Sequence, residues 1–210
     1  TLTNLICQSQ ITKHVMGHVF VIAQTDGLIR AAQTAQKTGT LPPVHLWDPP
    51  FCGDLDMEIR RDGTWFYQGT PIGRPAMVRL FSTILKREGD KFFLVTPVEK
   101  VGITVEDAPF VAVDFDIAGT GKGQSITFTT NVGDRVTAGS KTPIRVHHTP
   151  SNAPAPYVTV RAGLDALIDR KSFYRLVDIG QTNIIDNVPW FGVWSDGTFF
   201  KIIPVSELSL

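Results

Sequence analysis

The feature that most constrains the fold is a stretch of sequence that occurs twice. Residues 105–113, VEDAPFVAV, share their order of residue types with residues 185–193, IDNVPWFGV. Two further pairs of strings show the same likeness: 84–87 with 167–170, and 92–95 with 173–176. The spacing between the copies shortens along the chain, as short loop deletions would produce. We infer a duplicated helix–strand–turn–strand unit, and the seam between two such modules is a frequent place for a ligand.

The distribution of apolar residues predicts a β-rich α+β fold, with two related modules that each pack one helix on short antiparallel strands. The chain shows no alternation of strands with helices, so a parallel dinucleotide-binding sheet is not expected. The predicted organisation is a poorly defined N-terminal segment at 1–24, an N-terminal module with a leading helix at 25–117, and a C-terminal β-rich module at 118–210.

Local patterns predict individual elements. Helices are expected at 27–37, 75–87 and 161–170, and strands at 54–60, 110–117 and 172–179, among others. In the strand at 110–117 we expect Val111, Val113, Phe115 and Ile117 to face the core, with Ala112, Asp114 and Asp116 facing out. Asp62-Gly63 predicts a type I′ hairpin turn, and a related string at 196–200 predicts a second hairpin.

Composition argues against several classes of partner. The chain has 20 Lys and Arg and 20 Asp and Glu, so its formal net charge is zero. A neutral chain is a poor match for nucleic acid or an anionic membrane, and we expect neither as a partner. The longest early apolar run, at 19–23, is too short to span a bilayer. We therefore expect a soluble, cytoplasmic protein without a cofactor, and a homo-oligomer remains open.

No strong catalytic motif is present, which favours a binding protein over an enzyme. The glycine-rich string at 119–123 lacks the Ser or Thr that follows the lysine of a phosphate loop, so it predicts a hairpin turn. Two acidic stripes, Asp54-Asp56-Glu58 and Asp114-Asp116, could together hold a divalent metal ion. The simpler interpretation is that each stripe is the solvated side of a half-buried strand.

The loop at 69–75, GTPIGRP, leads into a predicted helix. Exposed amides and the helix dipole favour an anion at such a place, where Arg74 could clamp a phosphate or carboxylate. A structural helix entry with Arg74 in an ion pair explains the same residues. A second polar cluster, at 96–100, includes Glu99 and Lys100, and a solvated turn with a Glu–Lys pair is the favoured explanation for any single turn of this kind.

Several long strings resemble a bacterial family defined as domain of unknown function 1285. They are PPVHLWDPPFCGD at 42–54, DGTWF at 62–66, GTPI at 69–72, LVTPVEK at 94–100 and VEDAPF at 105–110. The resemblance implies a duplicated β-rich module, with a C-terminal part loosely like a pleckstrin-homology barrel. It also implies a small, nucleotide-like ligand in the cleft between modules, a role in signalling, and no catalytic activity.

These observations lead to one main hypothesis and two alternatives. The main hypothesis is a regulatory protein that binds a small anionic ligand at the seam. Arg74 and Lys100 would supply charge, Trp47 or Trp65 would stack on a ring, and Glu99 and Asp107 would accept hydrogen bonds. The first alternative is a protein-interaction module with an apolar patch around Phe191 and Trp194. The second is a metal-dependent phosphoester hydrolase that uses the acidic stripes.

Overall fold

The computed structural model describes residues 29, 33, 41–148 and 154–208. The chain divides into two compact units. Unit 1 runs to Ile59 and continues from Thr64 to Val105, and unit 2 comprises Arg60–Gly63 and Glu106–Leu210. The main division after Val105 falls earlier than the predicted boundary after Ile117, because the strand that follows pairs with strands of unit 2.

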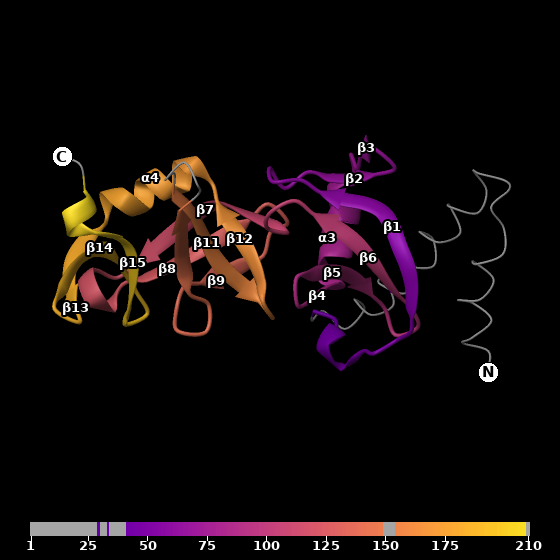
Figure 1. Ribbon diagram of the computed structural model, residues 1–210, viewed down its shortest axis with the longest axis horizontal. Helices are drawn as coiled ribbons and strands as arrows, with labels where there is room; N and C mark the ends of the chain where they lie inside the picture. The colour runs from indigo at the N-terminus through magenta and orange to yellow at the C-terminus, as the bar shows by residue number, and fades with distance from the viewer. Residues whose placement is uncertain (1–28, 30–32, 34–40, 149–153, 209–210) are drawn as a thin grey trace, which may run out of the picture. The chain divides into compact units, whose positions relative to one another are not determined.

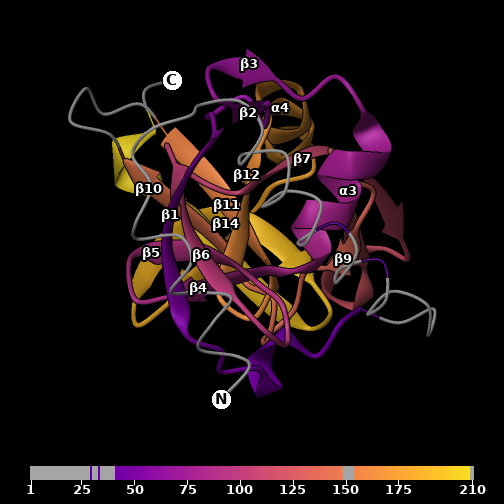
Figure 2. The same ribbon diagram turned by 90° about the vertical axis from the view of Figure 1, so that its right-hand side faces the viewer.

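Unit 1 is built on one mixed six-stranded sheet, ordered β3-β2-β1-β6-β5-β4. Its elements are η1 (Val44–Leu46), β1 (Phe51–Ile59), β2 (Trp65–Tyr67), β3 (Thr70–Pro71), α3 (Pro75–Thr83), β4 (Leu85–Glu88), β5 (Lys91–Val95) and β6 (Lys100–Val105). Only β1 and β6 run parallel to each other, and the remaining pairs are antiparallel. Helix α3 lies beside this sheet (Figures 1 and 2), where Phe81 stacks on Trp65 with ring centroids 6.4 Å apart.

Unit 2 contains a six-stranded sheet, ordered β10-β11-β12-β7-β8-β9, and a three-stranded sheet, ordered β13-β14-β15. Its elements are β7 (Phe110–Ala118), η2 (Gly121–Gly123), β8 (Ser125–Thr130), β9 (Arg135–Thr137), β10 (Ile144–His148), β11 (Pro154–Arg161), β12 (Leu164–Ile168), α4 (Arg170–Asp178), β13 (Gln181–Ile185), β14 (Val188–Ser195), β15 (Thr198–Pro204) and η3 (Val205–Glu207). The prediction of a β-rich α+β fold is confirmed. As predicted, 119–123 forms the turn between two antiparallel strands, β7 and β8.

The helix predicted at 161–170 is wrong in position, because the helix of this region is α4, at Arg170–Asp178. Residues 164–168 form β12, where alternate side chains are buried, and the helix α4 occupies most of the segment predicted as a strand. Helix α4 starts there because the Asp169 carboxylate accepts a hydrogen bond from the Ser172 amide at 2.7 Å. Leu176 then packs in the core one turn later.

Helix α3 ends at Thr83, four residues before the predicted end at Arg87. Ile84 and Leu85 are buried, as a helix face would bury them, but Ile84 caps the end of α3 and Leu85 is the first residue of β4. Each of the two helices is followed by three antiparallel strands, β4-β5-β6 after α3 and β13-β14-β15 after α4. The order helix–strand–turn–strand therefore recurs.

The repeated strings do not coincide with this recurring order of elements. Residues 105–113 cover the connection from β6 to β7, which belong to different sheets, whereas 185–193 cover the two-residue turn of the β13–β14 hairpin. Likewise 92–95 lies in β5, and its counterpart 173–176 lies in α4. The pairs of similar strings therefore fall on different elements, and they do not mark the two helix–strand–turn–strand segments.

The predicted orientation of β7 is wrong at Ala112, Val113 and Ile117 and correct elsewhere, including Asp114 and Asp116, which are exposed as predicted. Val111 and Phe115 are buried, but Val113 and Ile117 are 38% and 43% exposed, and Ala112 is fully buried. The pairing of β7 with β8 shifts register between Ala112 and Asp114. The departures at Ala112 and Val113 lie at this irregularity, where the pairing inserts a residue. Ile117 lies in the run of three exposed residues that ends the strand.

The two Asp-Gly hairpins differ. Asp196-Gly197 forms a two-residue turn in which both residues have positive φ, 48° and 68°, as a type I′ turn requires. In the β1–β2 hairpin, Ile59 pairs with Trp65, and of the central residues only Gly63 has positive φ, at 82°. The predicted hairpin exists, but the predicted type I′ turn at Asp62-Gly63 is wrong.

The expected N-terminal segment at 1–24 lies outside the described residues, as does most of the helix expected at 27–37. Of that helix the structure describes Ile29 and Gln33, and both are helical. Within the described parts of the chain, no helix has the length and apolar character needed to cross a membrane.

Candidate functional site

Two of the predicted ligand-binding residues, Lys100 and Trp47, belong to one charged cluster in unit 1. The Nζ of Lys100 lies 2.9 Å from one oxygen of Glu88, and the Nζ of Lys86 lies 3.0 Å from the other. Lys86 also donates a hydrogen bond to the Trp47 carbonyl at 3.2 Å. The two ammonium groups therefore share one carboxylate.

The charged side chains of this cluster pair with one another. Hydrogen bonds from Lys100 and Lys86 lower the pKa of Glu88, so this carboxylate stays ionised at neutral pH. The Lys100 ammonium also lies 5.1 Å from the centre of the Phe93 ring, a favourable cation–π contact. Glu99 is next to Lys100 in sequence, and burial raises its pKa. Most of the positive charge of Lys100 is thus matched inside unit 1.

The remaining predicted residues of unit 1 lie in different surroundings. Trp65 is 1% exposed and stacks on Phe81, so the structure places it in the core rather than on a binding surface. Arg74 is exposed and stands directly before the first turn of α3, where its side chain makes no capping hydrogen bond. Trp65 is thus a core residue, and Arg74 lies on the surface.

Asp107 belongs to unit 2 and has two partners there. One carboxylate oxygen accepts a hydrogen bond from the Tyr157 hydroxyl at 2.7 Å, and the other lies 3.3 Å from Nε of Arg61. Burial, and then the hydrogen bond to Asp107, raise the pKa of Tyr157 to about 12. The carboxylate of Glu106 also accepts a hydrogen bond from the Arg61 amide at 2.8 Å. Asp107 therefore holds an arginine in place.

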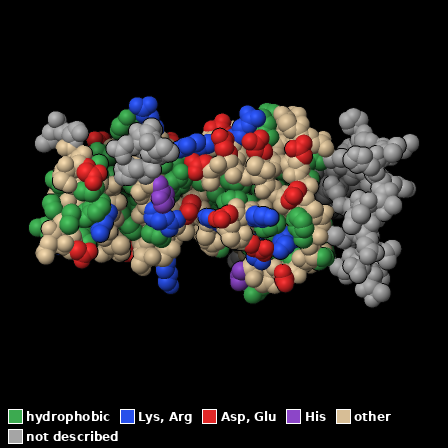
Figure 3. Space-filling model, in the orientation of Figure 1, with side chains coloured by type: hydrophobic (Ala, Val, Ile, Leu, Met, Phe, Trp, Pro, Cys, Tyr) green, Lys and Arg blue, Asp and Glu red, His purple; other side chains and the backbone are tan. Residues whose placement is uncertain are grey.

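The acidic stripes do not form a metal site in the described residues, where no three His, Cys, Asp or Glu side chains lie close enough to bind an ion. Asp114 pairs with Arg175, and Asp116 pairs with Arg135 at 2.7 Å. On the face shown in Figure 3, Lys and Arg side chains are interspersed with Asp and Glu side chains. The stripe on β7 therefore acts as a solvated, ion-paired surface.

The most promising site is a cavity of about 430 Å³ that lies entirely within unit 2. Its lining residues are Arg61, Pro154, Ala155, Pro156, Leu167, Ile168, Asp169, Arg170, Phe173 and Tyr174. The prolines come from the start of β11, the aliphatic residues from the end of β12, and the aromatic residues from α4. This volume lies within the range of small-molecule sites, about 300–1,000 Å³.

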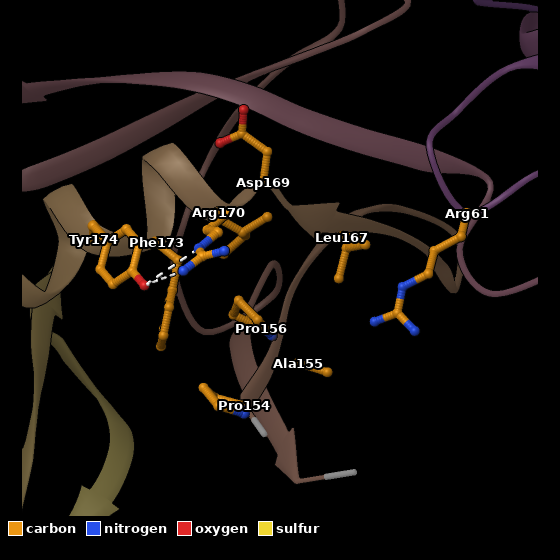
Figure 4. Close-up of a pocket in the computed structure, with 10 residues that line it drawn as sticks. Arg61, Pro154, Ala155, Pro156, Leu167, Asp169, Arg170, Phe173 and Tyr174 are labelled. Carbon is orange, nitrogen blue, oxygen red and sulfur yellow. Dashed lines mark hydrogen bonds between the residues drawn. The ribbon is translucent and has the colours of Figure 1, made fainter. Parts of the chain in front are cut away.

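Two arginines flank this mostly apolar cavity. Figure 4 shows the Arg61 side chain on one side and Arg170 on the other, with Leu167 between them and the three residues from Pro154 to Pro156 along one wall. Nε and Nη2 of Arg170 lie 3.2 Å and 3.0 Å from the Tyr174 hydroxyl. This hydroxyl is neutral, so it orients the guanidinium group without cancelling its charge.

Asp169, the acidic residue of the lining, does not form an ion pair with Arg170. The Asp169 carboxylate points away from Arg170 and the prolines (Figure 4), because it caps the first turn of α4. In the described part of the chain, no carboxylate lies within 4.0 Å of the Arg170 guanidinium group as an ion-pair partner. The geometry thus combines an apolar wall with an uncompensated cation.

Neither arginine was predicted as a site residue. A signal for Arg170 was present in the sequence: Asp169, Ser172 and the apolar Phe173 and Leu176 follow the pattern of a capped amphipathic helix, which places residue 170 in its first turn. For Arg61 the sequence offered no comparable signal, because its role depends on Asp107 and on β11, both far away in sequence.

Two family models match most of the chain. Residues 42–108 match the N-terminal domain of the domain of unknown function DUF1285, and residues 109–202 match the C-terminal domain of the same family. The chain belongs to the DUF1285 family. The resemblance noted in the sequence is thereby confirmed, and the DUF1285 division after residue 108 lies close to the division between the two units.

Solved structures of other DUF1285 proteins are similar to this chain. A crystal structure of a family protein from Silicibacter pomeroyi DSS-3 is 63% identical over 86% of this chain and 97% of its own, with a TM-score of 0.78. A second, from Shewanella baltica OS155, is 30% identical over 59% of this chain and 91% of its own, with a TM-score of 0.49. No curated protein matches the chain.

Proposed function

We propose that this DUF1285 protein binds a small organic anion in the cavity of unit 2. The observation that carries the proposal is the placement of two arginines from separate segments beside one cavity of about 430 Å³. Guanidinium groups bind carboxylates and phosphates through paired hydrogen bonds. An apolar wall beside them would take up the rest of the molecule.

The geometry supports binding rather than catalysis. The polar groups nearest the cavity already have structural partners: Asp169 caps α4, and Asp107 holds Arg61. Among the described residues that line the cavity, none is a Ser, Cys, His or Lys. The nucleotide-like ligand, the site at the seam and the signalling role that the sequence suggested stay predictions, and the cavity in unit 2 is the site that we would test first.

A thermal-shift screen of the full chain against carboxylates, phosphates and nucleotides tests this function. A ligand present at about 100 times its dissociation constant adds about 2.7 kcal/mol to the free energy of unfolding, which is easily measured. We expect at least one anion to stabilise the protein, and Arg170→Ala to remove that stabilisation. A screen in which every anion leaves the melting temperature unchanged would contradict the proposal.

One observation favours a second candidate, a protein-interaction role. Strand β13 stands at the edge of the three-stranded sheet, and Ile184 on it is 69% exposed. Val188, at the start of β14, is 42% exposed. Exposed edge strands accept an additional strand from another chain.

Phe191 and Trp194, around which an apolar patch was predicted, are both half-buried. Trp194 packs on Phe199 with ring centroids 5.2 Å apart, and the Lys122 ammonium lies 5.1 Å from its ring centre. The interaction surface would therefore be the β13 edge. A homo-oligomer detected by analytical ultracentrifugation and dissociated by Ile184→Lys would support this role, and a monomer at all concentrations would argue against self-association.

A further inference from the structure

We infer that the preferred ligand of the unit 2 cavity is a monoanion with an apolar body, such as a medium-chain or aryl-substituted carboxylate, rather than a nucleotide. This inference rests on the proposed function and narrows its ligand class. Three features of the cavity carry it: its single arginine without a described carboxylate partner, the backbone amides that are missing or already engaged in its lining, and its apolar wall.

One of the two arginines beside the cavity already has a carboxylate partner, and the other has none among the described residues. Arg61 faces Asp107 at 3.3 Å, and Asp169 lies in the lining beside Arg170, although its carboxylate points away. Arg170 is therefore the cation of the site whose charge is not already matched by a described carboxylate. One added negative charge can be bound by Arg170 with help from Arg61, whereas a multiply charged phosphate would lack sufficient counter-charge.

Several backbone positions around the cavity cannot donate a hydrogen bond to a phosphate. Nucleotide sites commonly cradle phosphate groups with several free amides, often at a helix N-terminus. Pro154 and Pro156 have no N–H group. At the start of α4, the Ser172 amide donates to the Asp169 carboxylate and the Phe173 amide donates to the Asp169 carbonyl. These two amides at the start of α4 are therefore not available to a ligand.

The wall of the cavity suits a hydrocarbon body. Six of its lining residues are proline, alanine, leucine, isoleucine or phenylalanine. Ala155 and Ile168 are at least 95% buried, so this side of the cavity is rigidly packed. A bound apolar chain would gain about 25 cal/mol for each Å² that it removes from water. The cavity volume of about 430 Å³ accommodates a carboxylate of the size of octanoate or 3-phenylpropionate.

The test is isothermal titration calorimetry of the full chain with four probes. Octanoate and 3-phenylpropionate carry one charge and an apolar body, 1-octanol has the body without the charge, and AMP has a nucleotide phosphate. We expect both carboxylates to bind and 1-octanol and AMP to bind at least about tenfold more weakly, the factor that one charge-assisted hydrogen bond supplies.

Two variants complete the test. Arg170→Gln should weaken octanoate binding about tenfold, since it removes the charge and keeps much of the side-chain length. Arg135→Gln is the matched control: it changes another arginine of unit 2, whose partner is Asp116 and which is absent from the lining, and it should bind octanoate like the parent chain. The melting temperature of each ligand-free variant shows that it is folded.

The outcomes separate the inference from the proposed function. Tighter binding of AMP than of octanoate, lost in Arg170→Gln, would overturn the monoanion inference and leave anion binding in place. Equal binding of octanoate and 1-octanol would overturn both, because charge would then contribute nothing. An absence of binding by all four probes would overturn the inference, and a flat wider screen of anions would overturn the proposed function as well.

Discussion

The two units contain positive charge in contrasting arrangements. In unit 1, Lys86 and Lys100 come from neighbouring parts of one sheet and share the carboxylate of Glu88 between them. In unit 2, Arg61 and Arg170 flank a cavity, and their closest partners, Asp107 and the Tyr174 hydroxyl, hold them in orientation. A cation enclosed by carboxylate partners contributes to local structure, whereas a cation held beside an apolar cavity is available to a ligand.

The largest effect that we expect concerns the loop that carries Arg61. Gly63→Ala should lower the free energy of unfolding by about 2 kcal/mol or more, because φ is 82° there and a Cβ atom would lie 2.5 Å from Nδ2 of Asn131. The amide of Asn131 also donates to the Gly63 carbonyl at 3.2 Å. Urea unfolding followed by fluorescence measures the change.

The second Asp-Gly turn provides the control for this prediction. Gly197→Ala should cost only about 1 kcal/mol, since φ is 68° but nothing lies within 4 Å of the added Cβ. Equal losses in the two variants would show that the close approach of Asn131 to Gly63 is unimportant.

A pair of substitutions tests the contrast between the units directly. Arg170→Ala should weaken binding of an anionic ligand by about 1.4 kcal/mol, a tenfold change in affinity. Lys100→Ala should leave affinity unchanged and destabilise the protein slightly, because Lys100 is paired with Glu88. Calorimetric titration and thermal melting of both variants provide the two measurements. If Lys100→Ala weakened binding and Arg170→Ala did not, the originally predicted site would be favoured over the cavity.

Alkaline pH tests the network behind Arg61. The pKa of Tyr157 is raised to about 12 in the folded protein. The contribution of Tyr157 to the free energy of unfolding is therefore fully present below the ordinary tyrosine pKa of about 10 and is lost as pH rises toward 12. We expect a loss of about 1 kcal/mol over this window, less than the pKa shift alone would give, because solvent partly screens the group. In Tyr157→Phe this part of the pH dependence should disappear, whereas Tyr174→Phe, at an exposed position, should retain it.

The smallest effect concerns the cluster of unit 1. The pKa of Glu88 is lowered, so its stabilising contribution is present above the ordinary glutamate pKa and is lost as pH falls through the lower folded-state value. We expect only a few tenths of a kcal/mol, since the pair is partly exposed to solvent. Glu88→Gln should flatten the acid side of the stability profile, and an unchanged profile would show that Glu88 contributes nothing measurable.

Prediction from sequence succeeded where a local pattern had a single structural solution. The alternation that buries Met57 and Ile59 in β1 was recognised, as was the hairpin at Asp196-Gly197. It failed where a local pattern had two solutions. The apolar residues of 161–179 were compatible with a helix followed by a strand, and the Asp169 cap, which starts the helix later, was overlooked.

The candidate site shows the same limit more strongly. Trp65 was predicted to stack on a ligand, but an aromatic residue on a half-buried strand can face either side, and packing against Phe81 placed it in the core. Asp107 was recognised as a polar group of interest. Its partners, Tyr157 and Arg61, lie 50 and 46 residues away in sequence, so its role as a holder of Arg61 could not be read locally.

The sequence alone determined the family, the β-rich α+β class and most strand positions, because these depend on long specific strings and on local periodicity. Tertiary structure decided which charges are matched and which face a cavity. Whether a lysine or arginine is paired depends on which carboxylates the sheets bring within about 4 Å, and such distances arise from strand pairing and packing between distant segments. For that reason Lys100 and Arg170, which are both basic residues, have different surroundings in the folded protein.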